Sequence, residues 1–400
     1  MGDFQMSRNS KVLVLILIAF VAIEAFHRHS LAVVNPRYHW RTFTRLDGLA
    51  GNNVRAILQH SSGDIWFATG AGVSRFNGLW QRYTKTEGLT DSDVIGIVEA
   101  NDGSLWFATR NGVSVAFINP ERPFERPSFK SFHTSDGLLD NQISAIAKDN
   151  YGNIWVGTPA GVSIFNGGGW ENHQDAEGLL SRGVTAIFAA SGGFAASGNQ
   201  QMWFGIKASS VEFSAVSRFD GQNWVVFTTD DGVPNGDIHA IIEDSIGNIW
   251  LGTSNGAARF DGHNWDTFTV ADGLAGNNVR AIALDSRRRL WFGTNNGVNV
   301  IGIASSFSPQ PFERSWLITT EDGLVSDNIQ AILEDGTGGL WLGTNSRGVN
   351  FSDRSWQVFA IESDLTDNFI TAINEDNSGN LWVGTLNGLY RLDAKLIRGL

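Results

Sequence analysis

Amide, carboxylate and basic side chains recur in two kinds of loop along this chain of 400 residues. One kind precedes an apolar run of the form [VI]-x-A-I, and the other follows a run that contains tryptophan. Side chains of these types bind hydroxyl-rich ligands through paired hydrogen bonds. The candidate ligand-binding residues are Asn53, Asp93, Arg182, Asp237, Asn278 and Asn328 in the first kind of loop, and Arg110, Asn111, Lys207, Asn255, Asn296, Arg347 and Asn387 in the second.

Two interpretations of these loop residues stand. At any single position, a solvated turn residue explains an Asn or Asp, because both side chains bond to nearby backbone in turns. As a set on one face, the same residues form a ligand site, because loops on a rigid scaffold commonly carry binding. The repeated aspartate of the motif Asp-Gly-Leu is expected to bracket its turn through side-chain to backbone bonds.

Catalytic and metal-binding signatures are absent from the sequence. The eight histidines show no HExxH pattern or paired metal spacing, and no Gly-x-Ser-x-Gly elbow or calcium loop occurs. The chain has no cysteine, which excludes thiolate chemistry, disulfides and cysteine metal sites. We therefore expect no cofactor, no metal and a non-catalytic protein.

The charge pattern excludes some partners. The formal net charge is −12, and basic residues form no long run. Nucleic acids and anionic membrane surfaces require clustered Lys and Arg. We expect neither a nucleic-acid partner nor membrane contact beyond the N-terminal segment.

The elements that carry the loops are strands of one repeated unit. Eight tryptophans lie in strands of a form like x-[IL]-W, and seven others precede such a strand, mostly by 26 residues. In most copies strand A is [VI]-x-A-I and strand D reads W-x-x-[FY], while strand B holds the tryptophan and strand C follows a glycine turn. Asn-Gly and Asp-Gly turns join such strands into an antiparallel meander. The sequence therefore predicts an all-β protein of eight copies.

Four-stranded meanders that are apolar on both faces stack radially into a propeller. The first strand D, at residues 40–43, precedes any strand A, whereas no strand D follows the last strand C. We therefore expect a single eight-bladed β-propeller in which residues 40–43 supply the outer strand of the last blade. The alternative is seven blades plus an accessory repeat. In either ring, the D–A and B–C loops share one face around the channel mouth.

The N-terminus predicts export. Residues 12–23 are uninterruptedly apolar and follow Arg8 and Lys11, a length typical of a secretory signal rather than of a full membrane span. A signal-anchor that stays in the inner membrane is the alternative. The expected domains are a signal peptide or anchor at 1–32, a linker at 33–39, the propeller at 40–393 and a tail at 394–400.

The pattern DGL-x-x-N-x-[VI]-x-A-I, followed by G-x-[IL]-W-x-G-T, resembles the two-component regulator propeller repeat. Its best matches begin at Asp272 and Asp322. In that family the repeat builds the periplasmic sensor portion of hybrid sensor kinases, which is associated with carbohydrate fragments. The resemblance implies an exported, periplasmic or extracellular, ligand-binding domain, with a small molecule or oligosaccharide as ligand. This chain carries no kinase motif, so signalling would need a separate transducer.

Three functions are therefore compared. The first is a non-catalytic sensor-type propeller. The second is a protein-interaction platform, for which the motif Pro-Phe-Glu-Arg in the long C–D connections at 118–128 and 302–315 suggests a repeated surface feature. The third, favoured least, is a lyase or quinoprotein-type enzyme, which rests on fold analogy alone.

Overall fold

The computed structural model describes residues 41–119, 125–174, 183–191, 201–207, 214–302, 308, 310–313, 315–352, 370–375, 381–385 and 389–392. The chain divides into two units, Met1–Pro36 and Arg37–Leu400, and every described residue lies in the second. The expected export segment and linker lie outside the described residues. No helix in the described part of the chain is both long and apolar enough to cross a membrane.

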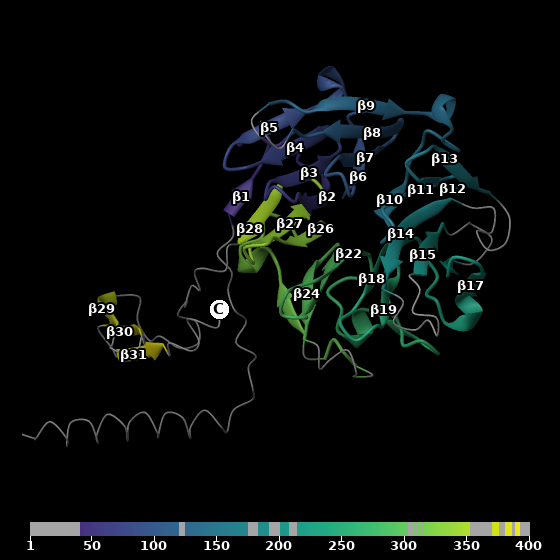
Figure 1. Ribbon diagram of the computed structural model, residues 1–400. Coiled ribbons are helices and arrows are strands. Elements are labelled where there is room, and N and C mark those ends of the chain that lie inside the picture. The colour runs from purple at the N-terminus through teal and green to yellow at the C-terminus, as the bar shows by residue number, and fades with distance from the viewer. Residues whose placement is uncertain are drawn as a thin grey trace, which may run out of the picture. The chain divides into compact units, whose positions relative to one another are not determined.

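Seven four-stranded antiparallel sheets form the blades of a β-propeller (Figure 1). From the innermost strand outward, the blades are β2 (Val54–Gln59), β3 (Ile65–Thr69), β4 (Gly72–Phe76) and β5 (Trp80–Tyr83); β6 (Val94–Glu99), β7 (Leu105–Thr109), β8 (Gly112–Phe117) and β9 (Ser128–Phe132); β10 (Ala145–Lys148), β11 (Ile154–Thr158), β12 (Gly161–Phe165) and β13 (Trp170–His173); β14 (Val184–Ala190), β15 (Gln201–Ile206), β16 (Ala215–Phe219) and β17 (Trp224–Thr228); β18 (Ile238–Glu243), β19 (Ile249–Thr253), β20 (Gly256–Phe260) and β21 (Trp265–Phe268); β22 (Val279–Leu284), β23 (Leu290–Thr294), β24 (Gly297–Ile301) and β25 (Trp316–Ile318); and β26 (Ile329–Glu334), β27 (Leu340–Thr344), β28 (Val349–Ser352) and β1 (Arg41–Phe43).

The ring closes on itself through the innermost strands. Each innermost strand contacts that of the next blade, and β26 of blade 7 contacts β2 of blade 1. A cluster of buried apolar residues fills each of the seven blade interfaces. The second strand of every blade is buried along its whole length, because it lies between two neighbouring blades. The tryptophans of these strands therefore pack between blades.

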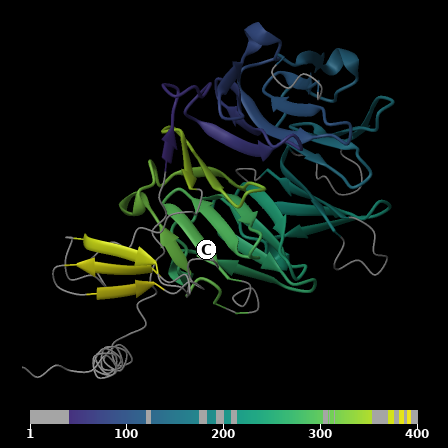
Figure 2. The same cartoon turned by 60° about the vertical axis from the view of Figure 1, so that its left-hand side comes forward.

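The expected eight blades are wrong, and the seven-bladed alternative is correct. The N-terminal strand β1 does close the ring, but its partner is β28 of the seventh copy, with Phe43 opposite Val349. Figures 1 and 2 both show purple β1 beside yellow-green β28. Phe43 packs against Trp341 of blade 7 and Trp80 of blade 1, so its aromatic ring joins the two ends of the ring.

The eighth copy forms a separate three-stranded antiparallel sheet of β29 (Ile370–Glu375), β30 (Leu381–Thr385) and β31 (Leu389–Leu392). Its strands pair only with one another among the described residues. The W-x-x-[FY] signature of residues 40–43 recurs in most other strands D, so it does not identify a particular partner. The closure of seven inner strands into a complete ring decides that the partner is β28.

The prediction of a surface feature is wrong for Phe312, the aromatic residue of the second Pro-Phe-Glu-Arg motif. Phe312 is only 2% exposed and packs against Trp250, Phe268 and Phe292. It also lies on Gly273, where other blades place their outer-strand aromatic residue, as Trp265 lies on Gly232. Phe312 therefore takes the place of that aromatic residue in blade 6 and has a packing role.

Short 3₁₀ helices mark the turn before most blades: η1 (Lys85–Glu87), η2 (Thr134–Asp136), η3 (Thr229–Asp231), η4 (Val270–Asp272) and η6 (Thr320–Asp322). In η4, the Asp272 carboxylate accepts a bond from the Thr269 N–H at 2.9 Å, and the Thr269 hydroxyl accepts from the Ala271 N–H. This reciprocal capping satisfies backbone donors that a helix start leaves open. The predicted bracketing role of the Asp-Gly-Leu aspartates is confirmed.

Candidate functional site at the D–A and B–C loops

The two kinds of loop meet at one end of the propeller, which we call the mouth. Within a blade, the carbonyl of the residue that precedes strand A accepts a bond from the first N–H of the B–C loop. The pairs are Asn53 with Gly70 at 3.1 Å, Asp93 with Arg110 at 3.1 Å, Gly183 with Lys207 at 2.8 Å, Asp237 with Ser254 at 2.9 Å, Asn278 with Asn295 at 3.1 Å and Asn328 with Asn345 at 3.0 Å.

The B–C loops also tie each blade to the next. The N–H of Gly256 donates to the carbonyl of Asn277 in the following blade at 2.6 Å. This glycine has φ = 121° and lies against the Phe268 carbonyl, so a side chain there would clash with backbone. The same bond joins Gly297 to Asp327 at 2.8 Å and Gly348 to Asn52 at 3.0 Å.

Most predicted residues are therefore placed together at the mouth. In the B–C loops, the backbone N–H groups bond to a preceding threonine hydroxyl, and the side chains are exposed: Asn111, Asn255, Asn296 and Arg347. Arg110 and Lys207 are also exposed. Two predicted residues, Arg182 and Asn387, lie outside the described residues.

A ring of residues that the sequence analysis missed lies at the start of the innermost strands. The pairing register shifts between the first and third residues of [VI]-x-A-I, so the variable second residue bulges out of the ladder. Bulges of this kind re-aim a side chain. The bulged residues are Arg55, Ile95, Thr185, His239, Arg280 and Gln330; Ser144 holds the same place directly before β10. In the sequence these residues could have been found as the one position of [VI]-x-A-I that differs widely between copies.

Bulged residues reach the loop that precedes the next blade's strand A. Arg55 of blade 1 forms an ion pair with the Asp93 carboxylate of blade 2, and Arg110 Nε lies 3.6 Å from the same carboxylate. Asp93 and Arg110 were predicted separately, and Arg55 joins them.

A second basic pair joins blades 5 and 6. Burial lowers the pKa of His239, and the positive charge of Arg280 lowers it further, whereas Asp237 and Asn278 act in the opposite direction. The imidazole is therefore held neutral. The Asn278 side chain raises this pKa because it faces the imidazole, but the two groups do not reach good hydrogen-bond geometry. His239 Nε2 and Asn278 Oδ1 are buried and have no other partner within the described part of the chain, and the buried Asn53 Oδ1 atom of blade 1 has none there.

The other bulged residues carry no charge. Ile95 is apolar, and the hydroxyls of Ser144 and Thr185 donate to backbone carbonyls, at 2.9 Å to Gly157 and 3.1 Å to Gly205. In blade 7, Gln330 Nε2 donates to Asn328 Oδ1 at 2.9 Å. Among the bulged residues, the basic side chains thus lie on blades 1, 5 and 6.

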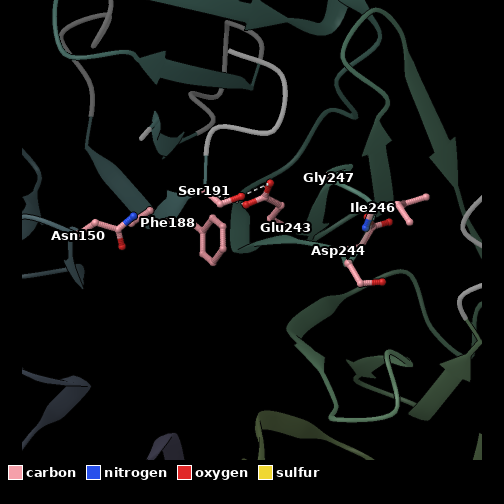
Figure 3. A pocket seen from close by; sticks show the side chains of 9 residues that line it. Asn150, Phe188, Ser191, Glu243, Asp244, Ile246 and Gly247 are labelled. Atoms are coloured by element: carbon pink, nitrogen blue, oxygen red, sulfur yellow. Dashed lines mark hydrogen bonds between the residues drawn. The ribbon is translucent and has the colours of Figure 1, made fainter. Parts of the chain in front are cut away.

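The A–B turns form the other end of the propeller, where two pockets lie. One pocket of about 540 Å³ is lined by Phe188, Glu243 and Ile246, among others (Figure 3). The Glu243 carboxylate in it accepts bonds from the Ser191 N–H at 2.6 Å and hydroxyl at 2.7 Å, a contact between blades 4 and 5. The other pocket, of about 880 Å³, is lined by His60, Glu99 and Lys148, among others.

Equivalent contacts join other blades at this end. The last residue of an innermost strand bonds to the A–B turn of the preceding blade, as Glu99 does with the Ser61 N–H at 2.9 Å and Lys148 with Asn101 Oδ1 at 3.0 Å. These side chains have a structural role between blades. In the described residues, no group of three or more His, Asp or Glu side chains is arranged to hold a metal ion.

Comparison with known proteins identifies the repeat. The family model described as two component regulator propeller matches residues 48–71, 88–111, 137–160, 232–255, 273–296, 323–346 and 364–387. The irregular fourth copy is not among the matched segments, whereas the eighth copy is. No curated protein matches the chain.

Solved structures share the fold. The extracellular domain of a putative hybrid two-component system from B. thetaiotaomicron is similar at 21% identity and a TM-score of 0.66, over 89% of this chain and 48% of that one. A second such domain from the same organism is 18% identical with a TM-score of 0.56, over 89% and 45%. This chain thus spans about half the length of either neighbour.

A virginiamycin B lyase from Staphylococcus aureus is also similar, at 14% identity and a TM-score of 0.58 over 78% of this chain and 98% of that one. Identities this low show the fold and no activity. The matched repeats and the observed blades agree, and this chain is a propeller built from two-component regulator repeats.

Proposed function

We propose that this chain is the exported, sensor-type domain of a bacterial signalling system and that it binds a hydroxyl-rich ligand, such as an oligosaccharide fragment, at the mouth. The observation that carries the proposal is the set of buried polar atoms at the mouth that have no well-formed hydrogen bond among the described residues: Asn53 Oδ1, Asn278 Oδ1 and His239 Nε2. Buried polar atoms are normally hydrogen-bonded. A ligand hydroxyl supplies the donor that each of these atoms needs.

Two further observations support this function. The repeat family is shared with sensor proteins, and the similar structures are extracellular domains of putative hybrid two-component systems. The side chains that would bind the ligand come from loops on a rigid ring, where a binding site needs little reorganisation. The proposal also includes export of the protein to the periplasm or cell surface. There it would act together with a separate membrane transducer.

The test is a thermal-shift screen of the purified full chain against oligosaccharides of defined length, followed by calorimetry on each hit. Asn278→Ser is expected to weaken binding about fivefold, the effect of one neutral hydrogen bond. Asn264→Ser is the matched control, because Asn264 lies in an exposed turn between β20 and β21, at the opposite end of the blades. A well-folded protein with no response to any glycan, or equal loss in both variants, would contradict the proposed site.

A further inference from the structure

Blades 1 and 6 carry the same mouth sequence in two different electrostatic settings. Residues 47–57 and 272–282 both read DGLAGNNVRAI, so Arg55 and Arg280 occupy equivalent bulges. The residue that the next blade offers differs. Blade 2 offers Asp93, which pairs with Arg55, whereas blade 7 offers Asn328 at the equivalent position.

Arg280 therefore lacks the carboxylate that its twin has. The amide oxygen of Asn328 already accepts from Gln330. Among the described residues, the Arg280 guanidinium takes part in no hydrogen bond or ion pair, and its charge acts on His239 instead. Arg280 is partly buried, so water screens this charge less than that of an exposed arginine.

The neighbours of Arg280 are suited to a ligand rather than to an internal counter-ion. His239 Nε2 and Asn278 Oδ1 lie in the same part of the mouth, where they face each other without a well-formed hydrogen bond and have no other partner in the described residues. An arginine offers a planar fork of N–H groups that matches a carboxylate or a sulfate. The net charge of −12 does not oppose binding at this point, because charges farther than about 8 Å are largely screened at physiological salt.

We propose that the ligand of the mouth carries an anionic group, a carboxylate or a sulfate ester, and that Arg280 binds this group while Asn278 and His239 bind neighbouring hydroxyls. This inference rests on the proposed function and names its ligand class as acidic oligosaccharides. Arg280 makes the site prefer anionic over neutral oligosaccharides. Arg55 holds the same bulge but is already neutralised by Asp93, so the site has one anion position on this side of the ring.

The experiment compares matched probes by calorimetry on the full chain: trigalacturonate, its methyl ester, and an O-sulfated galactan trisaccharide. A charged hydrogen bond contributes about 1.5–3 kcal/mol, so at least one acidic probe is expected to bind about 10- to 100-fold more tightly than the ester. The two acidic probes separate a carboxylate ligand from a sulfated one. Equal binding of acid and ester, or preference for neutral sugars, overturns the inference and leaves the proposed function standing.

Two variants test whether Arg280 causes the preference for acidic probes. Arg280→Gln places there the residue that blade 7 uses at the same position, Gln330, so the bulge is expected to fold unchanged. It should abolish the preference for acidic probes. Arg287→Gln removes the same charge from the A–B turn of the same blade and should keep the preference. A preference that survives Arg280→Gln would overturn the assignment.

A measurement without sugars separates failure of this inference from failure of the proposed function. Inorganic sulfate is titrated against chloride at constant ionic strength, and the His239 ring is followed by NMR. An anion on Arg280 offsets its charge, so the pKa of His239 should rise in the natural protein and stay constant in Arg280→Gln. No sulfate-specific change in the natural protein would refute an anion site at Arg280, whatever the glycans do.

Discussion

Ring closure by β1 predicts a specific effect of Phe43→Ala. Phe43 is partly buried between the first and last blades, with ring centroids 5.4 Å from Trp80 and 6.0 Å from Trp341. Truncation of a fully buried phenylalanine costs about 3–5 kcal/mol, and for this partly buried residue we expect about 2 kcal/mol. β1 is only three residues long, so this loss falls on the element that holds the ring together.

Hydrogen exchange under native conditions is the assay, because it reports local opening of individual strands. A loss of 2 kcal/mol corresponds to about 30-fold faster exchange of amides whose opening depends on β1. The amides of β28 that pair with β1 should show this increase, whereas those of β18 and β19 in blade 5 should change little.

Phe268→Ala is the matched control. Phe268 holds the equivalent place opposite a strand-C residue, but its strand β21 follows β20 directly in the chain. It is 3% exposed and packs against Trp250 and Phe312. This variant should lower the melting temperature at least as much and leave exchange in β28 near its original rate. Unchanged protection of β28 in Phe43→Ala, with Phe268→Ala behaving alike, would refute closure through β1.

Three further outcomes follow from buried polar groups. The Trp250 indole N–H donates to the Asp244 carboxylate at 2.9 Å, whereas the Trp203 indole N–H has no partner in the described residues. In urea denaturation, Trp250→Phe should therefore lower the free energy of unfolding by about 1–3 kcal/mol more than Trp203→Phe does. Equal losses in the two variants would contradict a stabilising bond. Arg280→Gln should raise the pKa of His239 in a ligand-free NMR titration, and a lowered value would show that the Arg280 charge does not act on this ring. Because folding lowers the pKa of His239, the unfolded chain binds a proton at this residue more readily than the folded protein does. The free energy of unfolding should therefore be unaffected by His239 above pH 6.5 and decline as the pH falls towards the pKa of the folded protein. Urea midpoints at two pH values should show a smaller decline in His239→Gln.

Local features of the sequence predicted much of the fold. The tryptophan spacing and glycine turns indicated four-stranded units, and the Asp-Gly-Leu aspartates cap their turns as expected. These predictions held because each rests on short-range physics: alternating burial defines a strand, and a side chain three residues away closes a turn. The loops predicted to carry the site also meet at one end, because every blade repeats the same connection.

Positions that depend on distant partners were not predictable in the same way. The spacing from Trp316 to the next strand is one residue shorter than in most copies, yet it did not show that Phe312 takes over the aromatic place. The bulged residues were visible as variation, but their chemistry depends on the next blade. Arg55 and Arg280 have identical local sequences, and only the facing Asp93 neutralises one of them.

The sequence by itself determined the repeat, the strand order within a blade and the residue types at the mouth, since these follow from contacts within about 40 residues. The tertiary structure decided how many copies enter the ring, which strand receives β1 and which of the equivalent residues Arg55 and Arg280 faces a carboxylate. The physical reason is that closure joins residues about 300 positions apart. The signature of an outer strand recurs in most copies, so only the geometry of seven packed inner strands selects its partner.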